Sequence, residues 1–149
     1  MQKLRLSNGT VCVGEGGLGK TYLAKQVFKG TDAVYLNTYT SPLAFYMYLY
    51  ENCHNHIIID DVVQLWDNSM CLGMLKAVLG ESDGERLVQW HSTSRYLEGV
   101  PQSFNFEGTI CFIHNSLPNN EDVRAVLSRV NNVDMTLSFK DKIGFLFYV

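Results

Sequence analysis

The stretch GEGGLGKT, residues 14–21, decides the fold of this chain. It follows the apolar run TVCVGE (10–15) and precedes the helix-compatible run YLAKQVF. Strand, glycine-rich turn and helix, in this order, form the context in which the pattern G-x-x-x-x-G-K-[ST] cradles phosphate. Glycines let successive backbone N–H groups point inward, and the helix adds the positive end of its dipole. We therefore expect a phosphate-binding loop between the first strand and the first helix.

This loop predicts ATP and Mg²⁺ as cofactors. Lys20 would reach the β- and γ-phosphates, and the hydroxyl of Thr21 can ligate Mg²⁺. The residues expected to contact the nucleotide are Gly14, Glu15, Gly16, Gly17, Leu18, Gly19, Lys20 and Thr21.

The run HIIIDD (56–61) supplies a second part of the site. Three consecutive isoleucines predict a buried strand, and ligands bind beyond the carboxyl ends of strands in open parallel sheets. Asp60 would hold Mg²⁺ directly or through water, and Asp61 would orient or deprotonate the attacking water. The alternative is a pair of strand-end carboxylates that caps the next segment.

The rest of the chain repeats this alternation of strand and helix. The 149 residues suit one domain, 1–149. Strand-like apolar runs lie at 10–15, 33–38, 56–62, 109–115 and 134–139, and helix-like segments around 20–28, 41–52, 68–79 and 120–130. Continuous apolar strands separated by helices predict a three-layer α/β/α fold with a parallel sheet.

Composition limits the partners and the location. The net charge of −3 gives no overall basic field, so any contact with nucleic acid must be local. No apolar run approaches the roughly 18 residues that span a bilayer, and the N-terminus lacks the apolar core of a signal peptide. We expect a cytoplasmic protein without a membrane partner.

The segment 81–108 is an insertion into this alternating pattern. Residues 86–90 and 95–97 are predicted to pair as a β-hairpin across the polar residues HSTS.

The motifs together resemble those of AAA+ ATPases over nearly the whole chain. GEGGLGKT resembles Walker A and IIIDD resembles Walker B. Asn115, at the end of the apolar run ICFIHN, matches sensor 1, which positions the hydrolytic water. Arg129, in SRV (128–130), resembles the arginine finger that acts on the γ-phosphate in an adjacent subunit. The resemblance implies a P-loop NTPase sheet in the order 5-1-4-3-2 and catalytic roles for Lys20, Asp60, Asp61, Asn115 and Arg129.

Within AAA+, the chain is most similar to superfamily III viral helicases and phage ATPases. Their DNA-tracking hairpin precedes sensor 1, where residues 81–108 lie here, so Trp90, His91 and Arg95 are candidates to stack on bases or grip phosphates. The insertion is acidic overall, and packing or subunit contact by the hairpin is an equal alternative. The helical lid of the family is absent, which indicates either a fragment or an unusually short member.

Three functions follow as hypotheses. The first is a ring-forming motor that translocates or remodels DNA in replication. We expect it to be a homo-oligomer, with a hexamer as one candidate ring size. The second is a loader or remodelling ATPase that acts on a protein partner. The third is a nucleotide-gated switch with little turnover. If the protein is viral, the host cytoplasm or nucleus is its expected location.

Overall fold

The computed structural model describes residues 8–38, 40–80, 84–91 and 97–134, which alternate between strand and helix. Along the chain these elements are β1 (Gly9–Val13), α1 (Lys20–Val27), β2 (Val34–Leu36), α2 (Pro42–Glu51), β3 (His56–Asp60), the 3₁₀ helix η1 (Val63–Leu65), α3 (Ser69–Leu79), β4 (Leu87–Gln89), β5 (Ser103–Asn105), β6 (Thr109–His114), α4 (Glu121–Leu127) and β7 (Asn131–Asp134). The predicted α/β class is confirmed.

The main sheet has five strands in the order β2-β3-β6-β1-β7, and all four pairings are parallel. With β6 and β7 as the fourth and fifth strands, this is the order 5-1-4-3-2 read from the other edge. In the register, Val13 of β1 lies opposite His114 of β6, and Asp60 of β3 lies opposite Ile113. The carboxyl ends of β1, β3 and β6 therefore meet at one edge of the sheet.

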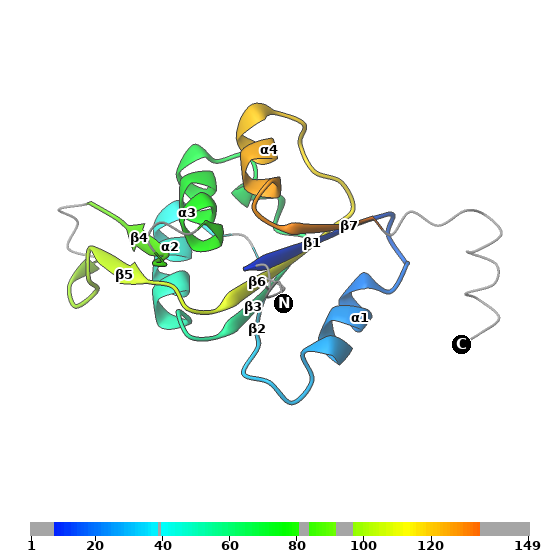
Figure 1. Cartoon of the computed structure of the whole chain (residues 1–149), viewed down its shortest axis with the longest axis horizontal. Helices are drawn as coiled ribbons and strands as arrows, with labels where there is room; N and C mark the ends of the chain where they lie inside the picture. Colours follow the sequence, from blue (N-terminus) through cyan, green and yellow to red (C-terminus); the bar gives the residue numbers. More distant parts are fainter. Residues whose placement is uncertain (1–7, 39, 81–83, 92–96, 135–149) are drawn as a thin grey trace, which may run out of the picture.

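Helices cover both faces of this sheet, as Figure 1 shows: α1 lies on one face, and α2, α3 and α4 lie on the other. Successive side chains of β3 face opposite sides of the sheet. Ile57 and Ile59 are buried in the large core beneath α2, α3 and α4, whereas Ile58 is buried beneath α1. The smaller core beneath α1 contains Ala24, Ile58, Cys111 and Ile113. The three predicted layers are present, but most of the buried apolar side chains lie on one side of the sheet.

The fifth strand starts earlier than its sequence pattern indicates. The prediction was 134–139, whereas β7 spans Asn131–Asp134 and residues 135–139 lie outside the described ranges. The reason is a shorter preceding helix: α4 ends at Leu127 rather than at 130, so the chain turns back into the sheet sooner. Parallel pairing with β1, from Thr10 opposite Asn131 onward, fixes the start of the strand.

The predicted hairpin has a different second strand. Leu87–Gln89 pairs antiparallel with Ser103–Asn105. Of the predicted second strand 95–97, residues 95 and 96 lie outside the described residues, and the Leu97 carbonyl closes a turn by accepting from the Val100 N–H at 3.0 Å. Phe104 of β5 makes edge contacts with Tyr46 and Tyr50 of α2. This packing against α2 explains why Ser103–Asn105 forms the second strand of the hairpin. Gly108 is required at the base, because a Cβ there would lie 1.8 Å from the Asn55 carbonyl oxygen.

Within the described ranges, no helix is both long and apolar enough to cross a membrane.

Candidate functional site

The glycine-rich loop joins the carboxyl end of β1 to the first turn of α1. Its start is fixed to the sheet, because the Gly14 N–H donates to the His114 carbonyl at 3.2 Å. Gly17 and Gly19 have φ values of 80° and 78°, in the left-handed region that side chains with a Cβ rarely adopt. The loop thus turns sharply enough to bring the N-terminus of α1 over the edge of the sheet.

Lys20 lies inside this loop rather than in solvent. It is 7% exposed, and its ammonium donates to the carbonyl oxygens of Gly14 and Glu15 at 2.7 and 2.6 Å. The two carbonyls hold the cation at the mouth of the loop, beside the first turn of α1. An ammonium held there by neutral acceptors can exchange them for an anion.

Asp60 brings the second motif to the same place. The Thr21 hydroxyl, in the first turn of α1, donates to Asp60 Oδ2 at 2.7 Å across 39 residues of sequence. Tyr35 of β2 donates its hydroxyl to the same carboxylate oxygen. Burial, followed by the hydrogen bond to Asp60, raises the pKa of Tyr35 to about 12, so its hydroxyl remains a donor.

Asp61 has an unusual backbone for a residue that is not glycine. Its φ is 56°, in the left-handed region, and its N–H donates to the Ile113 carbonyl at 2.8 Å. This conformation turns the chain away from β3 directly after Asp60, and the Asp61 side chain is exposed. The two carboxylates therefore differ in environment: Asp60 is held by two hydroxyl donors, whereas Asp61 faces solvent.

These side chains line one pocket of about 520 Å³, called here the loop pocket. Its wall consists of Gly16, Gly17, Gly19, Lys20, Thr21, Tyr22, Lys25, Asp60, Asp61, Ile113, His114 and Asn115. Of the predicted loop residues, Gly14, Glu15 and Leu18 do not line it. Gly14 and Leu18 are buried beneath the loop, and Glu15 is exposed.

Asn115 reaches the loop pocket from the end of β6, as its position after the fourth strand of the sheet predicts. It lies near Gly16, where a Cβ would be 3.8 Å from the Asn115 side-chain nitrogen. Strand alternation indicates that His114 lies on the opposite face from Asn115, yet His114 lines the same pocket. Alternation does not separate them because β6 ends at His114 and Asn115 lies beyond the strand.

Arg129 does not reach the loop pocket of its own chain. It follows α4 and lies beside the C-terminal end of α3, since a Cβ on Gly80 would be 3.3 Å from Arg129 Nε. Its guanidinium donates to the Ala125 carbonyl, and the residue is exposed. Because β7 begins two residues later, Arg129 lies at the amino edge of the strands, opposite the edge that carries the glycine-rich loop.

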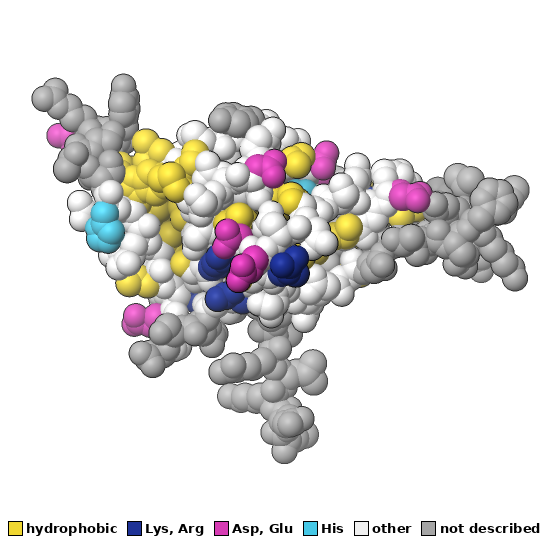
Figure 2. Space-filling view, turned by 90° about the horizontal axis from the view of Figure 1, so that it is seen from above, with side chains coloured by type: hydrophobic (Ala, Val, Ile, Leu, Met, Phe, Trp, Pro, Cys, Tyr) yellow, Lys and Arg dark blue, Asp and Glu magenta, His cyan; other side chains and the backbone are white. Residues whose placement is uncertain are grey.

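The surface around α4 carries charges of both signs. Figure 2 shows lysine and arginine side chains lying next to acidic ones on the face that bears α3 and α4. One such pair is Lys76 with Asp122, at 2.8 Å.

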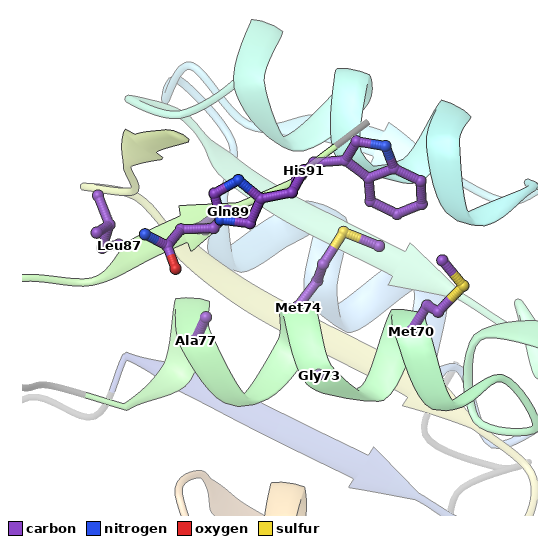
Figure 3. Close-up of a pocket in the computed structure, with 9 residues that line it drawn as sticks. Met70, Gly73, Met74, Ala77, Leu87, Gln89 and His91 are labelled. Atoms are coloured by element: carbon purple, nitrogen blue, oxygen red, sulfur yellow. The ribbon is translucent and has the colours of Figure 1, made fainter. Parts of the chain in front are cut away.

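The hairpin candidates divide into three cases. Trp90 is half-buried, with its ring centroid 5.8 Å from that of Tyr46, so most of its surface is used in packing. His91 is exposed and lines a groove of about 610 Å³ between α3 and β4, together with Met70, Met74 and Leu87 (Figure 3). Arg95 lies outside the described residues.

The oxygen donors in the loop pocket fit Mg²⁺. Thr21 Oγ1 and Asp60 Oδ2 lie 2.7 Å apart, and Mg²⁺ in nucleotide sites takes one or two protein oxygens, completing its shell with phosphate and water. In the described ranges, no cluster of three or more His, Cys, Asp or Glu side chains provides a separate metal site.

Sequence reasoning missed Tyr35 and Trp66 as members of this region. Trp66 is fully buried and donates its indole N–H to His114 Nε2 at 2.8 Å. The only signal for Tyr35 was alternation: in the run VYL, Val34 and Leu36 face one side of the sheet and Tyr35 faces the other.

No protein-family model matches this chain, and no curated protein matches its sequence. The function is therefore argued from the geometry of the loop pocket.

Proposed function

We propose that this chain is an AAA+ type ATPase core domain that binds ATP with Mg²⁺ in the loop pocket and hydrolyses it. The observation that carries the proposal is the hydrogen bond between Thr21 and Asp60, formed beside the buried ammonium of Lys20. It joins the start of α1 to the end of β3, so one cation and two hard oxygen donors converge beside a glycine-rich loop. These are the groups that phosphoryl transfer requires.

Each side chain then has a defined task. Lys20 exchanges its two carbonyl acceptors for oxygens of the β- and γ-phosphates, and Thr21 and Asp60 hold Mg²⁺, which neutralises charge on those phosphates. The oxygen of a water molecule forms a bond to the terminal phosphorus while the bond from that phosphorus to the bridging oxygen breaks. ADP leaves with the electron pair, and the proton of the water passes to Asp61. Asn115 orients the water.

The proposal includes an oligomer. Arg129 lies at the edge of the sheet opposite its own loop pocket, so it can serve a bound nucleotide only in a neighbouring copy. Its side chain is exposed and makes one described hydrogen bond, to the Ala125 carbonyl, which a phosphate oxygen can replace as acceptor. An arginine supplied in this way typically accelerates phosphoryl transfer about 10³- to 10⁵-fold.

The test is an ATPase complementation. Lys20→Ala chains keep the arginine but lose nucleotide, whereas Arg129→Ala chains bind nucleotide but lack the arginine. We expect each variant alone to be inactive and the mixture to release phosphate, with a rate per chain that rises with total concentration. Arg124→Ala serves as the matched control, because Arg124 is an exposed arginine on the same helix that donates to Asn119.

Two results would contradict the proposal. Turnover by Arg129→Ala alone, equal to wild type and independent of concentration, would remove the arginine from the mechanism. Tight ATP binding without hydrolysis at any concentration would favour a nucleotide-gated switch.

We propose DNA as the first substrate to screen, with a protein partner as the second candidate. A specific observation favours the second. In the described part of the insertion Glu85, Glu98 and Glu107 are exposed, while the guanidinium of Arg86 donates to the Val78 and Gly108 carbonyls. Stimulation of phosphate release by single- or double-stranded DNA would support the DNA motor, and indifference to both would support a protein-directed ATPase.

A further inference from the structure

His114 is a buried titratable residue at the loop pocket that the proposed mechanism does not use. It is the last residue of β6 and is 1% exposed. Its ring packs edge-on against Trp66, with centroids 5.4 Å apart, and stacks on Phe112 at 6.5 Å. These contacts fix the plane of the imidazole, so its two nitrogens point in defined directions.

The contact with Trp66 also fixes which nitrogen carries the proton. An indole N–H can only donate, and here it donates to His114 Nε2 at 2.8 Å. Nε2 must therefore be unprotonated, and the neutral ring carries its proton on Nδ1. Burial lowers the pKa of His114 to about 4, against the opposing effects of Asp61 and Asp60, so the ring is neutral near pH 7. Nδ1 is thus a permanent donor.

This donor lacks an acceptor among the residues that the structure describes. Nδ1 is buried, and none of those residues accepts its hydrogen. Leaving a buried donor unpaired is costly, so an acceptor that completes the bond would be favoured.

Asp61 is the candidate acceptor, because its side chain lines the same pocket as His114. Against the larger effect of burial, the Asp61 and Asp60 carboxylates both raise the pKa of His114, and Asp61 raises it more than Asp60 does. Its N–H is bound to Ile113, the residue before His114, and both side chains line the loop pocket. The Asp61 side chain is exposed, so packing against other residues does not fix its orientation.

We propose that His114 is a positioning residue for Asp61: its Nδ1–H donates to one Asp61 carboxylate oxygen when a nucleotide fills the loop pocket, and Trp66 keeps the proton on Nδ1. One oxygen of Asp61 is then held, and the other faces the attacking water. This inference rests on the proposed function, because Asp61 is the base in that mechanism.

Two substitutions test the roles of the two ring nitrogens of His114 separately. His114→Gln places an amide oxygen near Nε2, where it can still accept from Trp66, but provides no donor at Nδ1. His114→Asn places its amide nitrogen near Nδ1 and keeps a donor there, but loses the acceptor for Trp66. A third variant, Trp66→Phe, keeps the aromatic packing and removes the N–H that fixes the proton.

We expect His114→Gln to lower kcat about tenfold or more, as expected for loss of a hydrogen bond to a charged group, with KM for ATP nearly unchanged. His114→Asn should recover much of that loss, and Trp66→Phe should lower kcat in the same direction. A purely structural role would instead make the two His114 variants equally poor. Wild-type turnover in His114→Gln would overturn the proposal.

A second readout does not depend on turnover. In the imidazole ¹⁵N spectrum of the full chain, His114, assigned through His114→Gln, should carry its proton on Nδ1. Adding Mg²⁺ and a non-hydrolysable ATP analogue should slow exchange of that proton at least about tenfold, again as for a hydrogen bond to a charged group, and Asp61→Ala, which removes the acceptor oxygens, should abolish the change. A proton on Nε2, or an unchanged response in Asp61→Ala, would overturn the proposal.

Affinity measurements distinguish the remaining outcomes. If His114→Gln loses its preference for the ATP analogue over ADP, the donor contacts the terminal phosphate and the role through Asp61 is wrong. Failure of the proposed function has a different signature, because the wild-type chain would then bind neither nucleotide or would bind ATP without hydrolysing it.

Discussion

The N-terminus of α1 differs from those of the other three α-helices in the described ranges. α2, α3 and α4 begin at Ser41, Asn68 and Asn120, whose side chains accept hydrogen bonds from N–H groups of the first turn. α1 begins at Gly19, which has no side chain and a φ of 78°, and its first helical residue is the cation Lys20. The capped helices cover the large core, and the uncapped one bears the loop pocket.

The difference supports the ligand site that is proposed at the N-terminus of α1. A side-chain cap stabilises a helix by about 1 kcal/mol relative to alanine but by only roughly a few tenths of a kcal/mol relative to glycine, and a cation at the N-terminus opposes the helix dipole. α1 therefore lacks a stabilising side-chain cap and has an unfavourable positive charge in the same turn. Both costs disappear when an anion with several oxygens takes the first-turn N–H groups and the ammonium together.

The largest effect expected from this difference is stabilisation by nucleotide. ATP with Mg²⁺ at about 100 times its Kd should raise the free energy of unfolding by about 2.7 kcal/mol. Lys20→Ala should lose almost all of this gain, because the cation that offsets the phosphate charge is gone. Urea denaturation with and without the ligand measures both values.

Lys29→Ala is the control, since Lys29 is an exposed lysine just beyond the same helix and does not line the loop pocket. It should keep the full stabilisation. An equal gain in wild type and Lys20→Ala would mean that ATP binds elsewhere, and the contrast between the helix ends would lose its functional meaning.

A smaller effect is expected at a capped helix. Asn68 accepts from the Met70 and Cys71 N–H groups at 2.9 and 3.1 Å, and Asn68→Ala should lower the free energy of unfolding by about 1 kcal/mol. The gain in stability from ATP should stay at its wild-type value, because this cap is not part of the loop pocket. A reduced gain would show that the capped end of α3 contributes to binding, and the two kinds of helix end would no longer be distinct.

The residues that sequence analysis placed correctly share one property: their position follows from local pattern and from the geometry of parallel sheets. β-branched and apolar runs predicted the first four strands of the main sheet, and the carboxyl ends of parallel strands meet at one edge, which brings Asp60 and Asn115 to the glycine-rich loop. The family role of each residue remains a prediction.

The residues that were missed depend on contacts between elements that are distant in sequence. Tyr35 reaches Asp60 only because β2 pairs with β3 in the register that sets Tyr35 opposite Ile58, and spacing within either strand does not reveal this. The Trp66 contact with His114 joins η1 to β6 in the same way. The second strand of the hairpin was misplaced because Phe104 packs against α2, a preference that the alternation of 95–97 cannot show.

The smallest predicted effect is that of a substitution at Tyr35. It tests how strongly Asp60 is held beside the uncapped N-terminus of α1. The Tyr35 hydroxyl and that of Thr21 both donate to Asp60 Oδ2, so the carboxylate is held in one orientation beside Thr21. Tyr35→Phe removes one donor and keeps the ring, over which the Lys25 ammonium lies at 4.6 Å. We expect the Mg²⁺ concentration for half-maximal stabilisation by ATP to rise about threefold, as for one ordinary hydrogen bond. A fall in that concentration would show instead that the Tyr35 hydroxyl competes with the ion for Oδ2, because removing a competitor strengthens binding. The sign of the shift in Mg²⁺ concentration therefore decides between two roles of the Tyr35 hydroxyl. It either orients Asp60 for the metal or must leave Asp60 before the metal binds.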